Sequence, residues 1–168
     1  MPKIIENLES RLLAEARRQI GESGYSAMTI RSVAKGCGVG VGTVYNYFPS
    51  KDALVAGYML SDWRGCIAEI EAVSAVSDSP EAVLRCIHDR LCYFARLHGP
   101  VFRDEAAASA FAGSFSRYHA LLRSQLASPL RKFCTGEFAP EFIAEALLTW
   151  TMAGKSFQEI FGMIKKLF

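Results

Sequence analysis

The side chains best suited to chemistry lie between residues 24 and 54. Two short helices are expected there, joined by a glycine-rich turn, and the second carries the cluster Tyr45-Asn46-Tyr47. Phenol and amide groups gathered on one short helix can contact the phosphates and base edges of DNA. Glycines at positions 40 and 42 look like sites of close approach. The layout predicts a helix-turn-helix that reads DNA, and an ordinary helical hairpin in a globular core is the alternative.

The first helix of this pair is expected to begin after Thr29. The Thr29 hydroxyl can accept a bond from an otherwise unpaired backbone N–H of the next turn, which makes it a plausible N-cap. Apolar side chains then recur at helical spacing at Ile30, Val33 and Ala34. The run Gly-Cys-Gly at residues 36–38 is expected to end the helix.

The second helix is expected to span residues 40–48. Val44 and Phe48 are four residues apart, so they should face inward and leave the other side chains at or near the surface. Pro49 should end this helix, because proline disfavours a helical conformation at the residue before it. Ser50 should cap the helix that follows.

Residues 11–58 resemble the N-terminal domain of the TetR (tetracycline repressor) family of bacterial transcriptional regulators. The resemblance covers under a third of the chain and rests on Leu12, Leu13, Ala16, Gly24-Tyr25, Thr29-Ile30, Val33-Ala34, Gly38-Val39, Gly42-Thr43-Val44-Tyr45, Tyr47-Phe48, Ser50-Lys51 and Leu54. It implies phosphate contacts from Thr29, Tyr45, Tyr47 and Lys51, and contacts to base edges from Val41, Thr43 and Asn46. Gly40 stands where the family usually has a serine-like cap, a replacement that costs roughly a few tenths of a kcal/mol.

Length and charge agree with a small DNA-binding domain joined to a larger body. The 168-residue chain has a net charge of +2, whereas residues 1–51 alone hold seven Lys/Arg against four Glu, a net charge of +3. That modest basic excess suits nucleic-acid binding. We expect a helix-turn-helix domain at residues 1–51 and a helical ligand-binding and dimerisation domain at residues 52–168. No run approaches 18 apolar residues, and acids lie near the N-terminus, so neither a membrane partner nor a signal peptide is expected and the expected location is the cytoplasm.

Catalytic and metal-binding patterns are not found in the sequence. Its five cysteines show no Cys-x-x-Cys spacing, and with three scattered histidines they make no zinc pattern. Cys86 with His88, or Cys92 with His98, could form a metal or redox pair, but buried cysteines that act as small apolar residues are the favoured interpretation. The chain also lacks a phosphate loop and a Gly-x-Ser-x-Gly elbow. We therefore expect no enzyme, no metal and no cofactor.

The body is expected to be helical throughout, which makes the whole chain an all-α protein. Predicted helices cover residues 51–73, 80–98, 101–112, 116–133 and 140–166, with Ser79 as the cap of the second and Pro129 as a kink or break in the fourth. A ligand pocket between these helices could be lined by aromatic side chains: Trp63, Phe94, Phe102, Phe111, Phe115 and Tyr118. The same side chains could instead be plain core.

The predicted last helix carries two adjacent apolar stripes. One stripe contains the residues expected to form a dimer interface: Ile143, Leu147, Trp150, Phe157, Phe161 and Ile164. Two stripes give the helix a wider apolar side than one core contact needs. One side can therefore face its own domain and the other a second subunit, while complete burial in a monomer is the alternative.

The resemblance implies a function for the whole chain. It implies a homodimer that presents two recognition helices to successive major grooves of a palindromic operator in double-stranded DNA. It further implies a repressor that a small-molecule effector releases from DNA, and the Phe- and Trp-rich composition of the candidate pocket predicts that this effector is apolar or aromatic. Two alternatives remain, namely a DNA-bound interaction protein without an effector and an all-α enzyme with an incidental helix-turn-helix.

Overall fold

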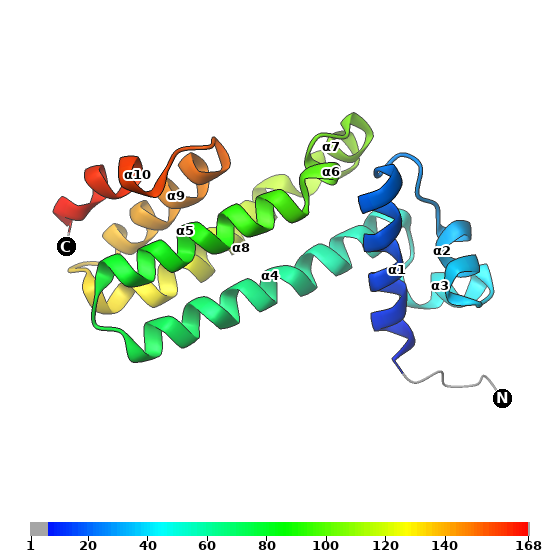
Figure 1. Cartoon of the computed structure of the whole chain (residues 1–168), viewed down its shortest axis with the longest axis horizontal. Coiled ribbons are helices and arrows are strands. Elements are labelled where there is room, and N and C mark those ends of the chain that lie inside the picture. The colour runs from blue at the N-terminus through cyan, green and yellow to red at the C-terminus, as the bar shows by residue number, and fades with distance from the viewer. Residues whose placement is uncertain (1–6, 168) are drawn as a thin grey trace. The chain divides into compact units, whose positions relative to one another are not determined.

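The chain folds into helices joined by short turns. The structure is a computed structural model that describes residues 7–167, apart from the side chains of Phe115 and Leu167. Within this range every regular element is helical, as the sequence predicts (Figure 1). The α-helices are α1 (Leu8–Ser23), α2 (Ile30–Cys37), α3 (Val41–Tyr47), α4 (Lys51–Val76), α5 (Pro80–Leu97), α6 (Gly99–Phe102), α7 (Glu105–Phe111), α8 (Phe115–Ala127), α9 (Phe138–Met152) and α10 (Phe157–Ile164). Short 3-10 helices occupy Ala112–Ser114, Ser128–Phe133 and Lys165–Leu167. None of the helices described is long and apolar enough to cross a membrane.

Two compact units make up the chain, and each is built from two separate stretches of sequence. The first unit contains the residues up to Asp62 together with His98–Gly113. The second contains Trp63–Leu97 together with the residues from Ser114 onward. α4 therefore begins in the first unit and ends in the second, whereas α6 and α7 belong to the same unit as α1–α3.

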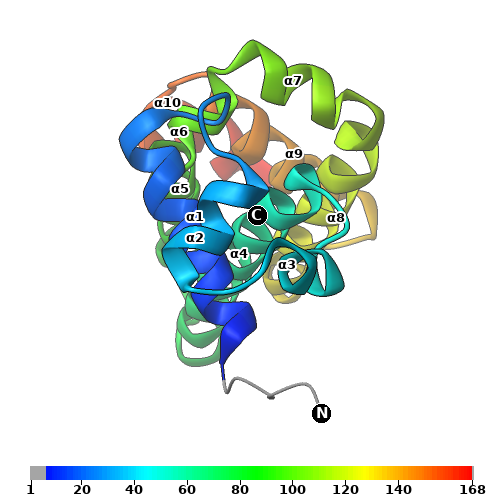
Figure 2. The same cartoon turned by 90° about the vertical axis from the view of Figure 1, so that its right-hand side faces the viewer.

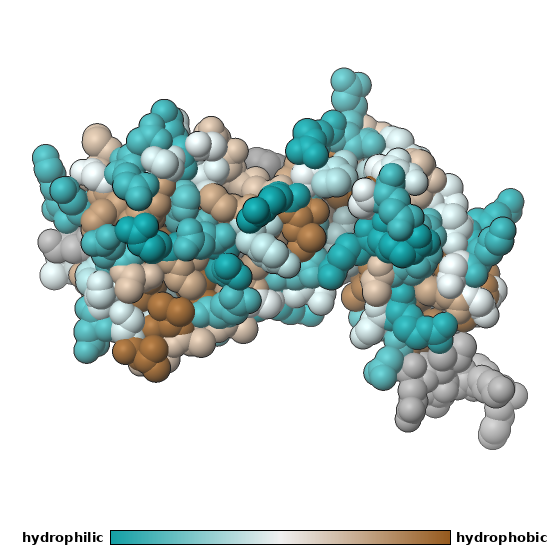
Figure 3. Space-filling model, in the orientation of Figure 1, coloured by the Kyte–Doolittle hydropathy of each residue, from teal (hydrophilic) through white to brown (hydrophobic). Residues whose placement is uncertain are grey.

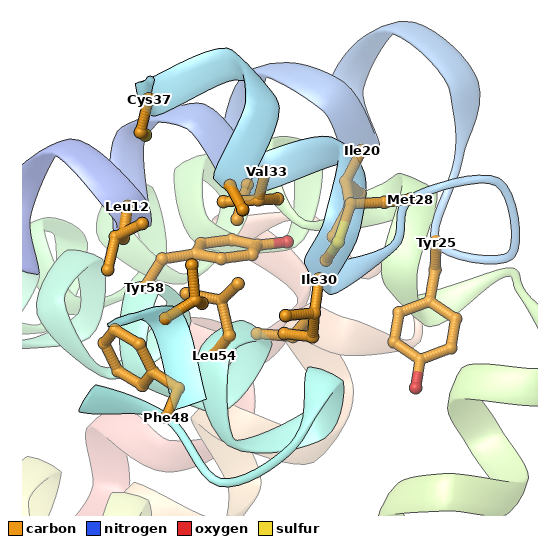
Figure 4. Close-up of a cluster of buried hydrophobic side chains, with 14 of the residues drawn as sticks. Leu12, Ile20, Tyr25, Met28, Ile30, Val33, Cys37, Phe48, Leu54 and Tyr58 are labelled. Carbon is orange, nitrogen blue, oxygen red and sulfur yellow. The ribbon is translucent and has the colours of Figure 1, made fainter. Parts of the chain in front are cut away.

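Apolar side chains from several helices form the core of the first unit. α1 buries one face, with Leu8, Leu12, Ala16 and Ile20 at intervals of four residues. Figure 4 shows Leu54 and Tyr58 of α4 among side chains from α1, α2 and the end of α3. Val101 of α6 and Ala107 of α7 belong to the same cluster. The core of this unit is therefore complete only when residues 98–113 are included.

The helix-turn-helix has nearly the predicted boundaries, with one correction. Thr29 caps α2 as predicted, because its hydroxyl accepts a bond from the backbone N–H of Ser32 at 3.0 Å. Gly36 and Cys37 do not end α2, which continues through both residues. Gly38 ends it instead, with a φ of 67° that favours glycine. Gly36 lies inside the helix where α2 faces α1, and a Cβ at this position would clash with the side chain of Glu15 on α1.

The segment after α5 also differs from the prediction of one helix over residues 101–112. A short α6 comes first, with Pro100 in its first turn, and Asp104 then starts α7 as a new helix. The Asp104 carboxylate accepts hydrogen bonds from the backbone N–H groups of Ala106 and Ala107 at 3.0 and 3.2 Å. This N-cap explains the division, because a capping aspartate satisfies N–H groups that a continuous helix would bond to its own carbonyls.

A polar cluster joins α1, α4 and the start of α6 inside the first unit. The Asp62 carboxylate accepts a hydrogen bond from Arg17 and lies 3.3 Å from Nε2 of His98. The His98 ring is fully buried and stacks on Tyr58 with 5.4 Å between ring centroids. Burial, assisted by the positive charge of Arg17, lowers the pKa of His98 to about 4. The imidazole is therefore neutral at pH 7, and burial raises the pKa of Asp62.

The second unit is a helical body whose core confirms the predicted stripe of α5. Leu84, Ile87, Leu91 and Phe94 are all buried, and they pack with residues of α9. Ser79 caps α5 as predicted, accepting from the N–H of Ala82 at 3.3 Å. After α8, the residues Ser128–Phe133 form a 3-10 helix, so the break expected at Pro129 is also confirmed. α4 ends at Val76, which is 88% exposed, and Figure 3 shows apolar residues at the surface there.

The single last helix predicted over residues 140–166 is wrong. The structure has two helices, α9 and α10, separated at residues 153–156. Gly154 has a φ of 83°, and the N–H of Lys155 bonds back to the carbonyl of Trp150 at 2.9 Å, which is a Schellman ending. Ser156 and Glu159 then form a capping box that begins α10. The four-three spacing of apolar residues runs through this break, which is why periodicity alone does not reveal it.

The two-helix ending predicts opposite effects of alanine at two glycines. Gly154→Ala should lower the free energy of unfolding by about 1 kcal/mol, because alanine resists the left-handed conformation. Gly162 lies inside α10 with open space around it, so Gly162→Ala should raise the free energy of unfolding by up to about 1 kcal/mol. Urea denaturation measures both values. If Gly154→Ala were also stabilising, a continuous helix would be the better description.

The buried His98 predicts a pH dependence of stability. Below its unfolded pKa of about 6.5 the unfolded chain binds a proton that folded His98 resists until about pH 4, so stability falls as the pH falls through this window. The loss should reach up to about 3 kcal/mol at the acid end. In His98→Gln, the decrease in the free energy of unfolding that His98 causes between about pH 6.5 and pH 4 should disappear. Urea denaturation of both proteins between pH 4 and 7 tests this, and parallel curves would contradict it.

Candidate DNA-binding surface

A groove of about 490 Å³ lies on the first unit where α2, α3 and α4 begin. It is lined by Ser26, Met28, Thr29, Ile30, Arg31, Val41, Tyr45, Pro49, Ser50 and Lys51. Four of the eight residues predicted to contact DNA, namely Thr29, Val41, Tyr45 and Lys51, are thus brought together on its walls. In Figure 2, α2 and α3 face the viewer, and they pack directly against each other.

The other four predicted residues lie on or before α3. Asn46 and Tyr47 are exposed, as is Gly40 just before the helix, whereas Thr43 is half-buried. A Cβ built on Gly40 would meet Thr43 at an ordinary 3.8 Å, so the site has room for the serine-like residue that it replaces. The space next to Gly42 is open as well. Close approach of another molecule at both glycines is therefore sterically possible.

Burial of two side chains fixes which face of α3 points outward. α3 has seven residues, and Gly40 supplies no side-chain cap. Val44 is fully buried and Phe48 is 8% exposed, so both face inward as predicted. Tyr45, one position after Val44, points away from this buried face and is 51% exposed, and Tyr47 at the end of the helix is 42% exposed.

Arg31 is a groove residue that the predicted DNA contacts do not include. It lies in the first turn of α2, exposed, and lines the groove together with Thr29 and Tyr45. Its guanidinium is always charged and offers a fork of donors that fits phosphates or the edge of guanine. The sequence contains a signal for this location. Arg31 follows the N-cap Thr29 by two residues, so both lie at the same end of α2, next to the predicted phosphate contact.

Lys51, another groove residue, extends over the ring of Tyr25. Its Nζ lies 4.1 Å from the centre of that ring, a cation–π contact. Burial lowers the pKa of Lys51, and the carboxylates of Asp104 and Asp52 oppose that shift. The lysine is also placed by Ser50, whose hydroxyl accepts from the N–H of Ala53 at 3.0 Å and caps α4 as predicted.

Tyr25 anchors the loop between α1 and α2. Its hydroxyl donates a hydrogen bond to the Asp52 carboxylate, and its ring meets Phe111 edge-on with 6.3 Å between centroids. Burial, together with the negative charge of Asp52, raises the pKa of Tyr25, so the phenol keeps the proton that it donates. The loop is therefore attached to both α4 and α7.

The six predicted ligand-binding aromatics do not lie in one unit. Trp63, Phe94 and Tyr118 belong to the second unit, while Phe102 and Phe111 belong to the first. Trp63 and Phe94 are buried against each other at 5.4 Å, and Trp63 Nε1 donates to Gln125 at 2.6 Å. The side chain of Phe115 lies outside those that the structure describes. The pocket stays a prediction.

The predicted dimerisation residues divide by exposure. Ile143, Leu147, Phe157 and Ile164 are buried within the second unit, Phe161 is half-buried and Trp150 is 52% exposed. The other large apolar side chains exposed on α9 and α10 are Phe138, Phe142, Met152 and Met163. The interface stays a prediction as well.

The part of the chain that carries this surface is similar to known regulatory proteins. The family described as "Bacterial regulatory proteins, tetR family" matches residues 12–58. The regulator UidR of Escherichia coli K12 is 29% identical over 84 residues, covering 48% of this chain and 43% of UidR. BetI of Burkholderia thailandensis is 36% identical over 92 residues, covering 52% of this chain and 46% of BetI. This chain therefore spans less than half the length of each of these two regulators in the matched region.

Solved structures resemble the whole fold. The TetR-family repressor AlkX from Dietzia matches with a TM-score of 0.67 and 17% identity, covering 93% of both chains. FadR from Thermus thermophilus, solved in complex with lauroyl-CoA, matches with a TM-score of 0.61 and 20% identity, covering 95% of this chain and 92% of FadR. At such identities the likeness shows the fold alone.

Proposed function

We propose that this chain, whose residues 12–58 match the tetR family of bacterial regulatory proteins, is a homodimeric repressor that binds a palindromic operator. The observation that supports this most is the groove where α2, α3 and α4 begin, which gathers Thr29, Arg31, Tyr45 and Lys51. These side chains offer hydroxyl, guanidinium, phenol and ammonium donors along one surface, as contact with a phosphate backbone requires. α3 then presents Val41, Thr43 and Asn46 to base edges in the major groove.

A dimer would double this surface. Two copies of α3 must lie about 34–36 Å apart to enter successive major grooves, so each subunit reads one half of a palindrome. Exposed apolar side chains recur on α9 and α10, and the rings of Phe138 and Phe142 lie together with 6.0 Å between their centroids. Grouped apolar side chains at a surface mark interaction sites, which supports a second subunit as the partner.

A small apolar or aromatic effector would release the repressor. It must bind the DNA-free conformation more tightly than the DNA-bound one, and tenfold release needs a difference of about 1.4 kcal/mol. Support comes from the aromatic residues of the body and from FadR of Thermus thermophilus, whose structure holds lauroyl-CoA. Trp63 and Phe94, packed as core, favour the alternative of a DNA-bound interaction protein without an effector.

Selection of bound duplexes from a random library, followed by sequencing, tests the DNA-binding proposal. We expect enrichment of a palindrome whose half-sites are centred about 10 base pairs apart or a multiple of that spacing. Enrichment of a single half-site would contradict the dimer, and no enrichment at all would contradict sequence-specific binding.

Lys51 and Thr43 should differ in the kind of affinity that they supply. Lys51→Ala should weaken binding to the selected duplex and to random duplexes almost equally, and should reduce the slope of log affinity against log salt by about one unit per subunit. Thr43→Ala should instead change base preference at one position, because a threonine methyl can touch a thymine methyl. Fluorescence anisotropy over a salt series measures both. An unchanged salt slope in Lys51→Ala would refute its phosphate contact.

The effector proposal predicts the chemistry of compounds that stabilise the free protein. In a thermal-shift screen of a chemically mixed library, apolar or amphipathic compounds at about a hundred times their Kd should raise Tm by about 5 °C or more. The same compounds should lower affinity for the selected duplex. Stabilisation by metal ions or highly charged metabolites alone would count against an apolar pocket, and stabilisation without DNA release would favour the alternative without an effector.

A further inference from the structure

Asp104 shares its carboxylate between two parts of the first unit. One oxygen, Oδ1, accepts from the N–H groups of Ala106 and Ala107 and caps α7. The other, Oδ2, accepts from the backbone N–H of Ser26 at 3.1 Å. The Ser26 hydroxyl also donates to this carboxylate, at 3.0 Å to Oδ1 and 2.9 Å to Oδ2. Residues 78 positions apart in sequence are thus joined by a charged acceptor.

Ser26 belongs to the wall of the groove. It lines the groove beside Met28 and Thr29, and Thr29 is the N-cap of α2. Tyr25 and Met28 are anchored by burial on either side, at 4% and 1% exposure, whereas Ser26 is exposed. Ser26 itself has no core packing, so the hydrogen bonds that Asp104 accepts fix the one exposed point between these two buried anchors.

The carboxylate has an electrostatic effect on the same surface. Asp104 favours the charged form of Lys51, which also lines the groove. A negative charge near a surface that binds phosphates also repels DNA, because the phosphates are negative as well and salt screens the repulsion only weakly at such short distances. An acid at this position weakens nonspecific binding to DNA. Its presence is accounted for if Asp104 also holds the loop between α1 and α2 in position.

We propose that Asp104 is a positioning residue for DNA recognition. Its Oδ2 holds the loop between α1 and α2, and with it the start of α2, so that Thr29 and Arg31 meet the duplex together with Tyr45. The proposal rests on the proposed function, because it names a residue outside the helix-turn-helix that sets the geometry of the same groove. It assigns Asp104 no contact with DNA.

Asp104→Asn separates the two roles of the carboxylate. Asparagine keeps one oxygen, which can cap α7, and replaces the other with an NH2 group that cannot accept from the backbone N–H of Ser26. The ratio of affinity for the selected palindrome to affinity for a random duplex should fall about tenfold. Affinity for the random duplex should stay equal or rise, because a negative charge is removed. Hydrogen–deuterium exchange of the Ser26 backbone N–H, monitored by NMR in the absence of DNA, should become faster.

Glu105→Gln is the matched control. It removes the same charge one residue later, from an exposed side chain in the first turn of α7. Its affinity ratio should remain within about twofold of wild type and Ser26 exchange should not change. A fall in the ratio equal to that of Asp104→Asn would show that charge alone is responsible, and would overturn the positioning role.

Ser26→Ala provides a second variant that does not disturb α7. It removes the hydroxyl donor and keeps the backbone N–H, so the affinity ratio should fall by a smaller factor, about threefold. A wild-type ratio in Asp104→Asn overturns the proposal, and a wild-type ratio in Ser26→Ala does so if Asp104→Asn does not fold. If wild type itself shows no preference for any duplex, the proposed function fails, while Ser26 exchange still reports on the hydrogen bond.

Discussion

Burial of Val44 and Phe48 is the constraint on which the DNA-binding surface depends. A helix of seven residues that contains a glycine and lacks a side-chain cap is too short to be stable alone in water. Its place and rotation therefore come from the two apolar side chains that it inserts into the core of the first unit. Every outward residue of α3 takes its direction from those two contacts, so the chemistry of the surface is set by packing beneath it.

Local signals in the sequence predict this part of the fold well. A hydroxyl at Thr29, Ser50 and Ser79 caps a helix in each case, because one side chain and one nearby N–H suffice to form the bond. The end of the chain is different. The apolar spacing across residues 140–166 favours one helix, whereas Gly154 and the Ser156–Glu159 capping box divide it. Those two signals are present in the sequence, and a cap at both sides of a break outweighs a continuous stripe.

Tertiary relations explain what sequence reasoning missed at the candidate site. Arg31 has the pattern of a solvated charge, and its place in the groove follows only from how α2 packs on α3. Tyr25 belongs to the family pattern, yet its bond to Asp52 and its contact with Phe111 join it to helices far along the chain. Asp104 could be predicted as a helix cap from its local sequence, but not as the acceptor for Ser26. Contacts over such separations leave no periodic trace.

The split composition of the first unit has a consequence for how the protein is made. Val101 and Ala107 belong to the same core as Leu12 and Val33, yet they are synthesised after the whole of α5. At about 5–20 residues per second, several seconds of translation separate Asp62 from Gly113. During that interval the nascent helix-turn-helix has an incomplete apolar core and no acceptor at Asp104 for its α1–α2 loop. A chain released before residue 98 would carry every side chain predicted to contact DNA and still lack the packing that holds them in place.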